Sequence, residues 1–316
     1  MGEAVGWPGR GAGRLEAVSG EGRFPEIISP VRRIGRREFD FERQVAVMAI
    51  VNRTPNSFHD QGSTYALDSA VAAAVKAVDD GADWVDIGGF AFSAAQAGIG
   101  VEEEIERVVP VIAEVRAATD AVISVDTHRP EVARAAIEAG ADVLNDTNGL
   151  REPGIAEVAA AAGVSVVVTH SLGGPGRRVV RPSYADVVTE VADFLRERVS
   201  AVLKAGIAAD RIIIDPGHDL NKNTFHSLEL TRRLEEITSI GYPTLVALSN
   251  KDFIGETLDL PQGERKEGTI AANVVSILKG ARILRVHDVA ATVASVRMTE
   301  AVLGWRGPLA PAHNLA

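Results

Sequence analysis

From residue 45 onward, short runs rich in Val and Ile alternate with longer stretches in which apolar residues recur about every 3.6 positions. The short runs have the length and composition of buried strands, and each ends in or beside a polar residue. We predict strands at residues 45–51, 84–88, 122–126, 143–145, 164–170, 211–215, 244–249 and 282–287. The longer stretches predict helices at about residues 66–80, 102–118, 130–139, 154–162, 184–205, 224–240, 269–279 and 289–303, several of them followed by Gly, a common helix terminator.

Strands this uniformly apolar belong to a parallel sheet that is covered on both faces. Eight strand–helix alternations within residues 45–305 match a (β/α)8 TIM barrel in number and size. A doubly wound open sheet is the rival fold, but no G-x-G-x-x-G motif follows an early strand. Outside the barrel, Gly-rich residues 1–22 predict a flexible leader, residues 23–44 a hairpin or cap against the bottom of the barrel, and residues 306–316 a tail.

Composition narrows the class of protein. The 316 residues are 46% hydrophobic and include no cysteine, which excludes disulfide frameworks, thiolate metal sites and cysteine nucleophiles, and fits a reducing, cytoplasmic location. The net charge of −10 argues against nucleic acid and membrane partners, because both attract basic surfaces. A site for an anion must therefore be built from a local cluster of cations.

Polar residues at the ends of the predicted strands carry the candidate chemistry, because a barrel of this type builds its active site there. Asp126, Asn145 and Asp215 offer two carboxylates and an amide, which suit the hydrogen-bonding edge of a polar heterocycle such as a pterin. A simpler interpretation is that these residues only end strands, since Asp and Asn favour turns and helix caps. Polar residues at all eight strand ends favour a shared site.

Positive charge follows the last two predicted strands. Lys251 comes just after the seventh strand, and Arg285 and His287 belong to the eighth, where barrels commonly bind phosphate. Asn52, at the end of the first strand, is placed to join them or to ligate Mg²⁺. Ser249 lacks a G-x-S-x-G elbow and no H-E-x-x-H motif occurs, so the pattern predicts displacement of a phosphate leaving group by positioning and electrostatics.

Several of these segments resemble motifs of the dihydropteroate synthase family, in the family's order, through residues 45–303. The matching segments are N-R-T-P-N-S-F at 52–58 for N-V-T-P-D-S-F, D-I-G-G at 86–89, S-V-D-T at 124–127, G-A-D-x-x-N-D at 140–146, D-P-G at 215–217 and R-V-H-D-V at 285–289. The resemblance implies a TIM barrel, a homodimer, and an enzyme that joins p-aminobenzoate to hydroxymethyl-dihydropterin diphosphate in folate synthesis.

The resemblance also implies roles for individual residues. It assigns the pterin to Asp126, Asn145, Asp215 and Lys251. It assigns the diphosphate to Asn52, Arg285 and His287, with Asn52 also contacting Mg²⁺ that accompanies the diphosphate.

The chain departs from the family pattern mainly in two loops. Residues 88–95 read G-G-F-A-F-S-A-A in place of G-G-E-S-T-R-P-G, and Asn56 replaces the Asp of N-V-T-P-D. Residues 249–251 read S-N-K in place of S-R-K, and residues 215–222 read D-P-G-H-D-L-N-K in place of D-P-G-x-G-F-x-K. With Asn56 and Ser93 at the altered catalytic positions, we predict a divergent homologue that binds a pterin or another phosphorylated heterocycle and has weak or absent synthase activity.

Three other functions stay open at this point. An active synthase would need Arg53 to replace the lost loop arginine. A non-catalytic interaction protein would keep the barrel for stability and use residues 90–92 as a docking patch. A methyltransferase that binds a reduced folate is disfavoured, because the R-V-H motif suits a diphosphate that a methyl donor lacks.

Overall fold

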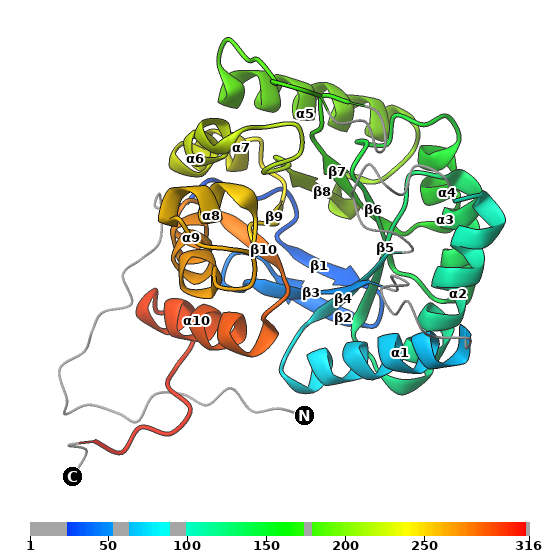
Figure 1. The fold of residues 1–316 in the computed structure, drawn as a ribbon, viewed down its shortest axis with the longest axis horizontal. Coiled ribbons are helices and arrows are strands. Elements are labelled where there is room, and N and C mark those ends of the chain that lie inside the picture. Colours follow the sequence, from blue (N-terminus) through cyan, green and yellow to red (C-terminus); the bar gives the residue numbers. More distant parts are fainter. Residues whose placement is uncertain (1–23, 53–62, 89–98, 174–178, 314–316) are drawn as a thin grey trace.

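The computed structural model describes residues 24–52, 63–88, 99–173 and 179–313, which form a closed barrel of parallel strands ringed by helices (Figure 1). The barrel strands are β3 Ala46–Asn52, β4 Trp84–Gly88, β5 Val122–Asp126, β6 Val143–Asp146, β7 Ser165–Thr169, β8 Ile212–Asp215, β9 Thr244–Val246 and β10 Ala281–Val286. They follow one another around the barrel in sequence order, and β10 closes it by pairing with β3. The predicted (β/α)8 TIM barrel is confirmed.

Helices cover the outside of the barrel (Figure 1). They are α1 Ser63–Asp79, α2 Val101–Ala118, α3 Pro130–Ala139, α4 Ile155–Ala162, α5 Val187–Lys204, α6 Thr224–Arg232, α7 Leu234–Thr238, α8 Asp252–Leu258, α9 Lys266–Leu278 and α10 Val289–Val302. Side-chain caps begin two of the long ones: Asp186 accepts hydrogen bonds from backbone N–H groups of α5, and Asp288 accepts one from α10.

The structure differs from the sequence prediction after β8. The helix predicted at 224–240 is two helices, α6 and α7, separated at Arg233, whose φ of −111° and ψ of 27° are not helical. The strand predicted at 244–249 ends at Val246, and α8 was not predicted because its seven residues are too few to show a helical period. Ser249 and Lys251 therefore lie in the connection between β9 and α8.

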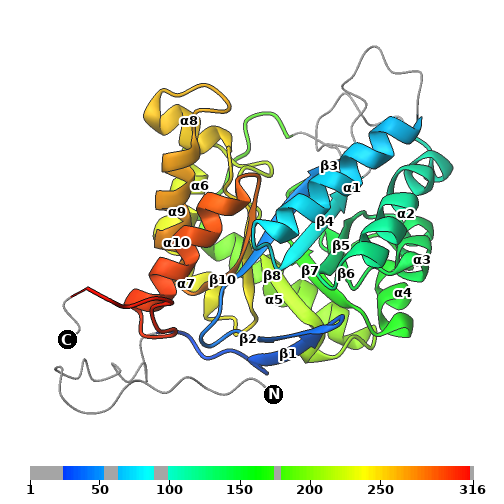
Figure 2. The ribbon, with the colours of Figure 1, turned by 90° about the horizontal axis from the view of Figure 1, so that it is seen from below.

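An antiparallel hairpin, β1 Val31–Ile34 and β2 Arg37–Asp40, lies across the amino end of the barrel (Figure 2). Phe39 and the following Phe41 are fully buried and pack with Met48 and Trp84, which point into the barrel. Burial of each phenylalanine contributes about 1.5–3 kcal/mol. The hairpin covers this end of the barrel, and the carboxyl ends of the strands form the other.

The alternation of side chains along each strand decides what reaches the barrel interior. Near the amino end the inward side chains are apolar: Ala46, Met48, Trp84, Val122, Val143, Val167, Ile213, Leu245 and Ile283. Counting onward in steps of two reaches a polar set at the carboxyl end: Asp86, Asp126, Asn145, Asp215 and Arg285. The fold thus turns these five side chains toward one another.

Two observations complete the outline of the chain. The leader expected at residues 1–22 lies outside the described residues, so its conformation stays a prediction. Among the helices that the structure describes, none combines the length and apolar character that crossing a membrane requires.

Candidate functional site

The buried carboxylate of Asp86 connects the inward-facing polar residues. Its oxygens accept hydrogen bonds from Arg285 Nε at 2.6 Å and from Asn145 Nδ2 at 3.2 Å. Arg285 Nη2 lies 3.5 Å from an oxygen of Asp126. Strands β4, β5, β6 and β10 each supply one of these side chains, so three predicted site residues, Asp126, Asn145 and Arg285, are brought together around Asp86.

Burial and charge set the protonation of this network. Burial raises the pKa of Asp126 to about 7, and the charge of Asp86 acts in the same direction while Arg285 opposes both. Burial lowers the pKa of Arg285, but Asp86 and Asp126 outweigh that effect and raise it above its ordinary value. The guanidinium therefore stays charged, whereas Asp126 changes its protonation near neutral pH.

Asp215 ends β8, and its carboxylate accepts the Gly217 backbone N–H at 2.7 Å. Burial raises the pKa of Asp215 to about 6, against this hydrogen bond and the nearby charges of Lys251, Lys222 and Arg285. Gly217 has a φ of 67°, and a Cβ there would lie 2.0 Å from a backbone carbonyl oxygen. Only glycine fits this turn, which explains the D-P-G sequence that holds Asp215 in place.

Lys251 directly precedes α8, makes no side-chain hydrogen bond to the start of that helix, and belongs to the same group of charges. Burial lowers the pKa of Lys251. The negative charges of Asp219 and Asp215 raise this pKa, and the positive charge of Arg285 lowers it. The predicted pterin lysine is therefore close enough to Asp215 and Arg285 for their charges to act on it.

His287 follows β10 and contacts Ser249. The Ser249 Oγ accepts the His287 backbone N–H at 3.1 Å and lies 3.1 Å from Nδ1 of the ring. In the tautomer whose Nδ1 accepts the serine hydrogen, Nε2 carries the ring proton and can donate to an anion. Desolvation, followed by the charges of Arg285 and Lys251, lowers the pKa of His287, so Arg285 is the stronger source of positive charge here, and the role of His287 at a diphosphate stays a prediction.

Two other polar residues at strand ends, Asp146 and His170, have structural roles. Asp146 accepts the backbone N–H groups of Asn148 at 2.7 Å and Leu150 at 2.8 Å, and it lies on the face of β6 opposite to Asn145. His170, just after β7, receives a hydrogen bond from Lys222 Nζ on its Nδ1 at 2.8 Å. For Asp146 and His170, the simpler interpretation holds: these polar residues stabilise the chain where a strand ends.

Lys222 and Asp86 are contributors that the sequence did not assign. Lys222 Nζ also donates to the carbonyl oxygens of Gly217 at 2.8 Å and Leu220 at 3.2 Å, so it ties the turn after β8 to the end of β7. Burial lowers the pKa of Lys222 to about 7. Composition gives no signal for a buried lysine, since lysine is usually exposed, but Lys222 does match the last residue of the family's D-P-G-x-G-F-x-K segment. Asp86 did have a signal in the sequence, because it lies two residues beyond Trp84, and side chains two residues apart on a strand face the same side.

Three of the departures from the family pattern lie within the described residues: Leu220 in place of a phenylalanine, and the polar residues Asp219 and Asn250. Asp219 takes the place of a glycine, has a φ of 61°, accepts Ser227 Oγ at 2.7 Å and accepts the Phe253 backbone N–H at 3.3 Å. Asn250 takes the place of an arginine, and its Oδ1 accepts the Gly263 backbone N–H at 3.1 Å. Both side chains hold neighbouring backbone, so the rim gains a carboxylate and lacks a cation here.

Asn52 is the last residue of β3 and pairs in register with Gly88 of β4. The altered loop positions Asn56 and Ser93 lie outside the described residues, as do Arg53 and residues 90–92. Within the described residues, no three His, Asp or Glu side chains come together in a way that could hold a metal ion.

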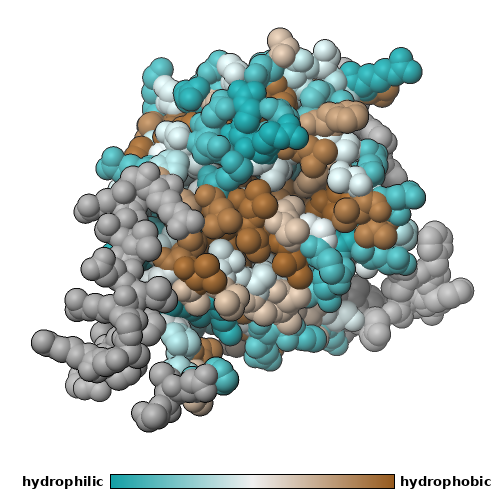
Figure 3. Space-filling view, turned by 90° about the vertical axis from the view of Figure 1, so that its left-hand side faces the viewer, coloured by the Kyte–Doolittle hydropathy of each residue, from teal (hydrophilic) through white to brown (hydrophobic). Residues whose placement is uncertain are grey.

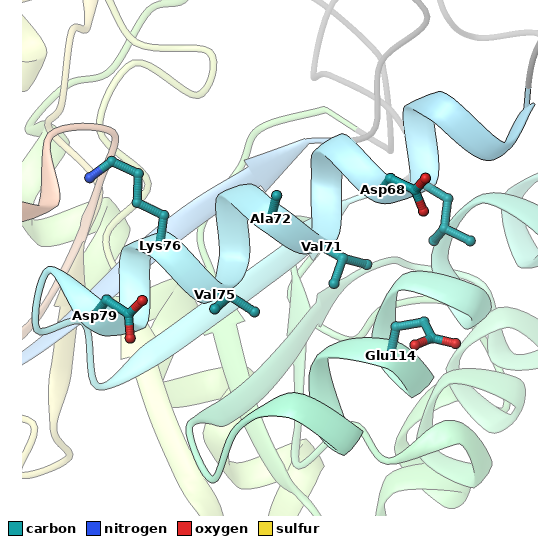
Figure 4. A pocket seen from close by; sticks show the side chains of 8 residues that line it. Asp68, Val71, Ala72, Val75, Lys76, Asp79 and Glu114 are labelled. Atoms are coloured by element: carbon teal, nitrogen blue, oxygen red, sulfur yellow. The ribbon is translucent and has the colours of Figure 1, made fainter.

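Two surface grooves lie outside the barrel interior. One, of about 530 Å³, runs from Ser249, Asn250 and His287 along the start of α9 and α10, so it adjoins the predicted anion side of the rim. The other, of about 570 Å³, lies between α1 and α2 and has an apolar floor that includes Val71 and Val75 (Figure 4). None of the predicted site residues lines this second groove.

Comparison with known proteins identifies the family. The pterin binding enzyme family matches residues 48–287. A Mycobacterium leprae relative named inactive dihydropteroate synthase 2 is 45% identical, over 87% of this chain and 96% of its own. Escherichia coli dihydropteroate synthase is 39% identical, over 81% of this chain and 91% of its own. A dihydropteroate synthase from Xanthomonas albilineans in complex with 7,8-dihydropteroate superposes with a TM-score of 0.78 and 40% identity, over 86% of this chain and 98% of its own. The chain therefore belongs to the pterin binding enzyme family, as a homologue of dihydropteroate synthase.

Proposed function

We propose that the chain binds a dihydropterin that carries a diphosphate, at the carboxyl end of its barrel, and joins it to p-aminobenzoate slowly or not at all. The observation that carries this proposal is the contact network in which Arg285 Nε reaches Asp86 at 2.6 Å while Nη2 lies 3.5 Å from Asp126. A permanent cation thus lies beside a carboxylate that suits a heterocycle, so one ligand with both a ring and an anionic tail fits both.

The ring is matched by three buried or half-buried side chains. A pterin has N–H donors and nitrogen and oxygen acceptors along one edge, and the carboxylates of Asp126 and Asp215 and the amide of Asn145 complement both kinds of group. Buried polar groups are costly when left unpaired, which favours a ligand that satisfies all three over an apolar ligand.

The diphosphate is matched by Arg285, Lys251 and the Nε2–H of His287. We also propose that Mg²⁺ accompanies the diphosphate, with Asn52 as its ligand from the protein. A single amide ligand suits Mg²⁺, which keeps several waters and binds chiefly through substrate phosphates. When bound, Mg²⁺ would neutralise part of the charge on the leaving group.

Weak or absent condensation is supported by the departures from the family pattern. Around the described rim, Asp219 adds a carboxylate and Asn250 removes a cation, and both changes disfavour an anionic second substrate such as p-aminobenzoate. In the sequence, Asn56 and Ser93 replace an aspartate and an arginine of the family loops. Removal of one charge-assisted hydrogen bond to a substrate costs about 1.5–3 kcal/mol, which corresponds to about 10- to 150-fold in rate. The Mycobacterium leprae relative is itself named inactive.

Isothermal titration calorimetry with hydroxymethyl-dihydropterin diphosphate and Mg²⁺ tests the binding proposal. We expect saturable binding to one site on the wild-type chain and loss of binding in Asp215→Ala. Ser165→Ala is the matched control, because this buried inward hydroxyl has no hydrogen-bond partner among the described residues and lies nearer the amino end of the barrel. A wild-type chain that shows no binding, or an Asp215→Ala variant that binds normally, would refute the assignment.

The alternative function is an active synthase, which the 39% identity to the Escherichia coli enzyme favours. Release of diphosphate that depends on p-aminobenzoate and proceeds at about 1 s⁻¹ or faster, an ordinary enzymatic rate, would establish it.

We further propose that the chain forms a homodimer through the outer face of α9 and α10. Val275, Leu278, Met298 and Val302 are 42–74% exposed on these two helices, and Figure 3 shows apolar side chains gathered across this side of the molecule. Light scattering after size exclusion tests the proposal: Met298→Glu with Val302→Glu should convert a dimer to a monomer, and a monomeric wild-type chain would exclude it. The cytoplasmic location expected from the sequence stays a prediction that cell fractionation can check.

A further inference from the structure

Asp86 lies one layer below the rim of the barrel. In the strand register it pairs with Ile50 and Ser124, whereas Gly88, Asp126 and Asn145 form the next layer toward the carboxyl end. The Asp86 side chain is 0% exposed. Its depth leaves no surface with which a ligand at the rim can make contact.

Asp86 nevertheless contacts both halves of the proposed site. Its oxygens accept hydrogen bonds from Asn145, on the heterocycle side, and from Arg285, on the anion side. We propose that Asp86 is a positioning residue that fixes Asn145 and Arg285 relative to each other, so that the ring and the anionic tail of one ligand are recognised in a single geometry. The inference rests on the proposed function.

The hydrogen bond to Nε gives Asp86 control over the direction of the guanidinium. This group is planar and its five N–H donors form a rigid fork, so fixing Nε also fixes where the other donors point. Nη2 makes only a long contact with Asp126, at 3.5 Å, and no described residue accepts a hydrogen bond from Nη1. The Arg285 side chain is 18% exposed, so its remaining donors are accessible to an anion.

A second role for Asp86 predicts the opposite experimental result. If the carboxylate served only as a counter-ion, it would weaken the attraction of Arg285 for an anion, and Asp86→Asn would tighten diphosphate binding by removing a negative charge. If the carboxylate positions Arg285, the same substitution weakens binding, because the single neutral oxygen of Asn must serve both Arg285 Nε and Asn145 Nδ2 and holds the guanidinium less firmly. The sign of the change therefore separates the two roles.

The test is to titrate inorganic diphosphate, at fixed Mg²⁺, and pterin separately into the wild-type chain, Asp86→Asn and Ser124→Ala. Ser124 is the matched control, because it lies beside Asp86 in the same inward layer and its buried hydroxyl has no partner among the described residues. Asp86→Asn should weaken diphosphate binding about tenfold or more and pterin binding severalfold, as expected for loss of a hydrogen bond to a charged group. Ser124→Ala should leave both affinities within about twofold of wild type.

The outcomes separate the inference from the function on which it rests. If the wild-type chain binds neither probe, the proposed function fails and the inference fails with it. If it binds both, and a folded Asp86→Asn binds diphosphate as well as or better than wild type, the inference alone is overturned.

A crystal structure of the wild-type chain with diphosphate and pterin provides a measurement that does not depend on the folding of a variant. We expect Arg285 Nε to stay within hydrogen-bond distance of Asp86, with no ligand atom in contact with the Asp86 carboxylate. An Arg285 side chain that leaves Asp86 to reach the anion would contradict the positioning role.

Discussion

Replacing Arg285 by methionine should destabilise the whole barrel, because it leaves the Asp86 carboxylate buried without its cation. The Asp86 side chain is 0% exposed and lies 2.6 Å from Arg285 Nε. For charge centres about 4 Å apart and an effective dielectric constant of about 20, the attraction is about 4 kcal/mol. Removal of one partner from a buried pair commonly costs about 3–5 kcal/mol, so the two figures agree. Methionine retains much of the aliphatic packing, which limits the change to the charge.

Urea unfolding followed by tryptophan fluorescence measures this effect, since one of the three tryptophans, Trp84, is buried in the barrel interior. We expect Arg285→Met to lower the free energy of unfolding by about 3–5 kcal/mol. The double variant Arg285→Met with Asp86→Asn should recover most of the loss, because neither charge then remains. A loss below about 1 kcal/mol, or a double variant as unstable as the single one, would refute the reasoning.

Three other predictions test the rest of the site. Pterin affinity should fall as the pH drops below about 7, because burial raises the pKa of Asp126 to about 7 and the protonated carboxyl accepts N–H donors poorly. Fluorescence titration of Asp126→Asn should show weaker binding that falls only below about pH 6, where Asp215 becomes protonated, and an acid limb still centred near 7 would exclude Asp126 as its source. Gly217→Ala should lower the free energy of unfolding by about 1–3 kcal/mol and weaken pterin binding, because the left-handed φ of 67° and the 2.0 Å approach to a carbonyl oxygen exclude a Cβ. Normal stability and normal pterin affinity would contradict this account of the turn. The combined substitutions Asn56→Asp, Ala91→Ser, Phe92→Thr and Ser93→Arg should raise the rate of diphosphate release with p-aminobenzoate, and no gain would locate the defect in the described rim at Asp219 and Asn250.

The fold was readable from the sequence because parallel strands buried on both faces leave a continuous apolar signal. The same signal does not give exact ends: it extended the strand starting at 244 past Val246, where the chain turns away from the sheet. It also missed the break at Arg233, since the apolar period continues from α6 into α7 although the backbone does not.

The candidate site was only partly readable. Polar strand ends indicated Asp126, Asn145, Asp215 and Arg285, but they also included Asp146, which caps a turn. The two-residue alternation of side chains separates these cases, because it turns Asn145 inward and Asp146 outward.

Contacts between distant segments could not be predicted. The hydrogen bond from Lys222 to His170 joins residues 52 positions apart, and the contact between Arg285 and Asp86 joins residues 199 positions apart. Neither spacing follows a period within one helix or strand, so only the closed barrel shows that these side chains meet.

The central claim, that the chain binds the pterin diphosphate without condensing it efficiently, is tested most directly by measuring binding and turnover on one sample, beside the Escherichia coli enzyme. We predict saturable binding of hydroxymethyl-dihydropterin diphosphate, with p-aminobenzoate-dependent release of diphosphate at least about 100-fold slower than in that enzyme, the effect of removing two charge-assisted hydrogen bonds. Release at the rate of the Escherichia coli enzyme, or absence of binding, would contradict the account.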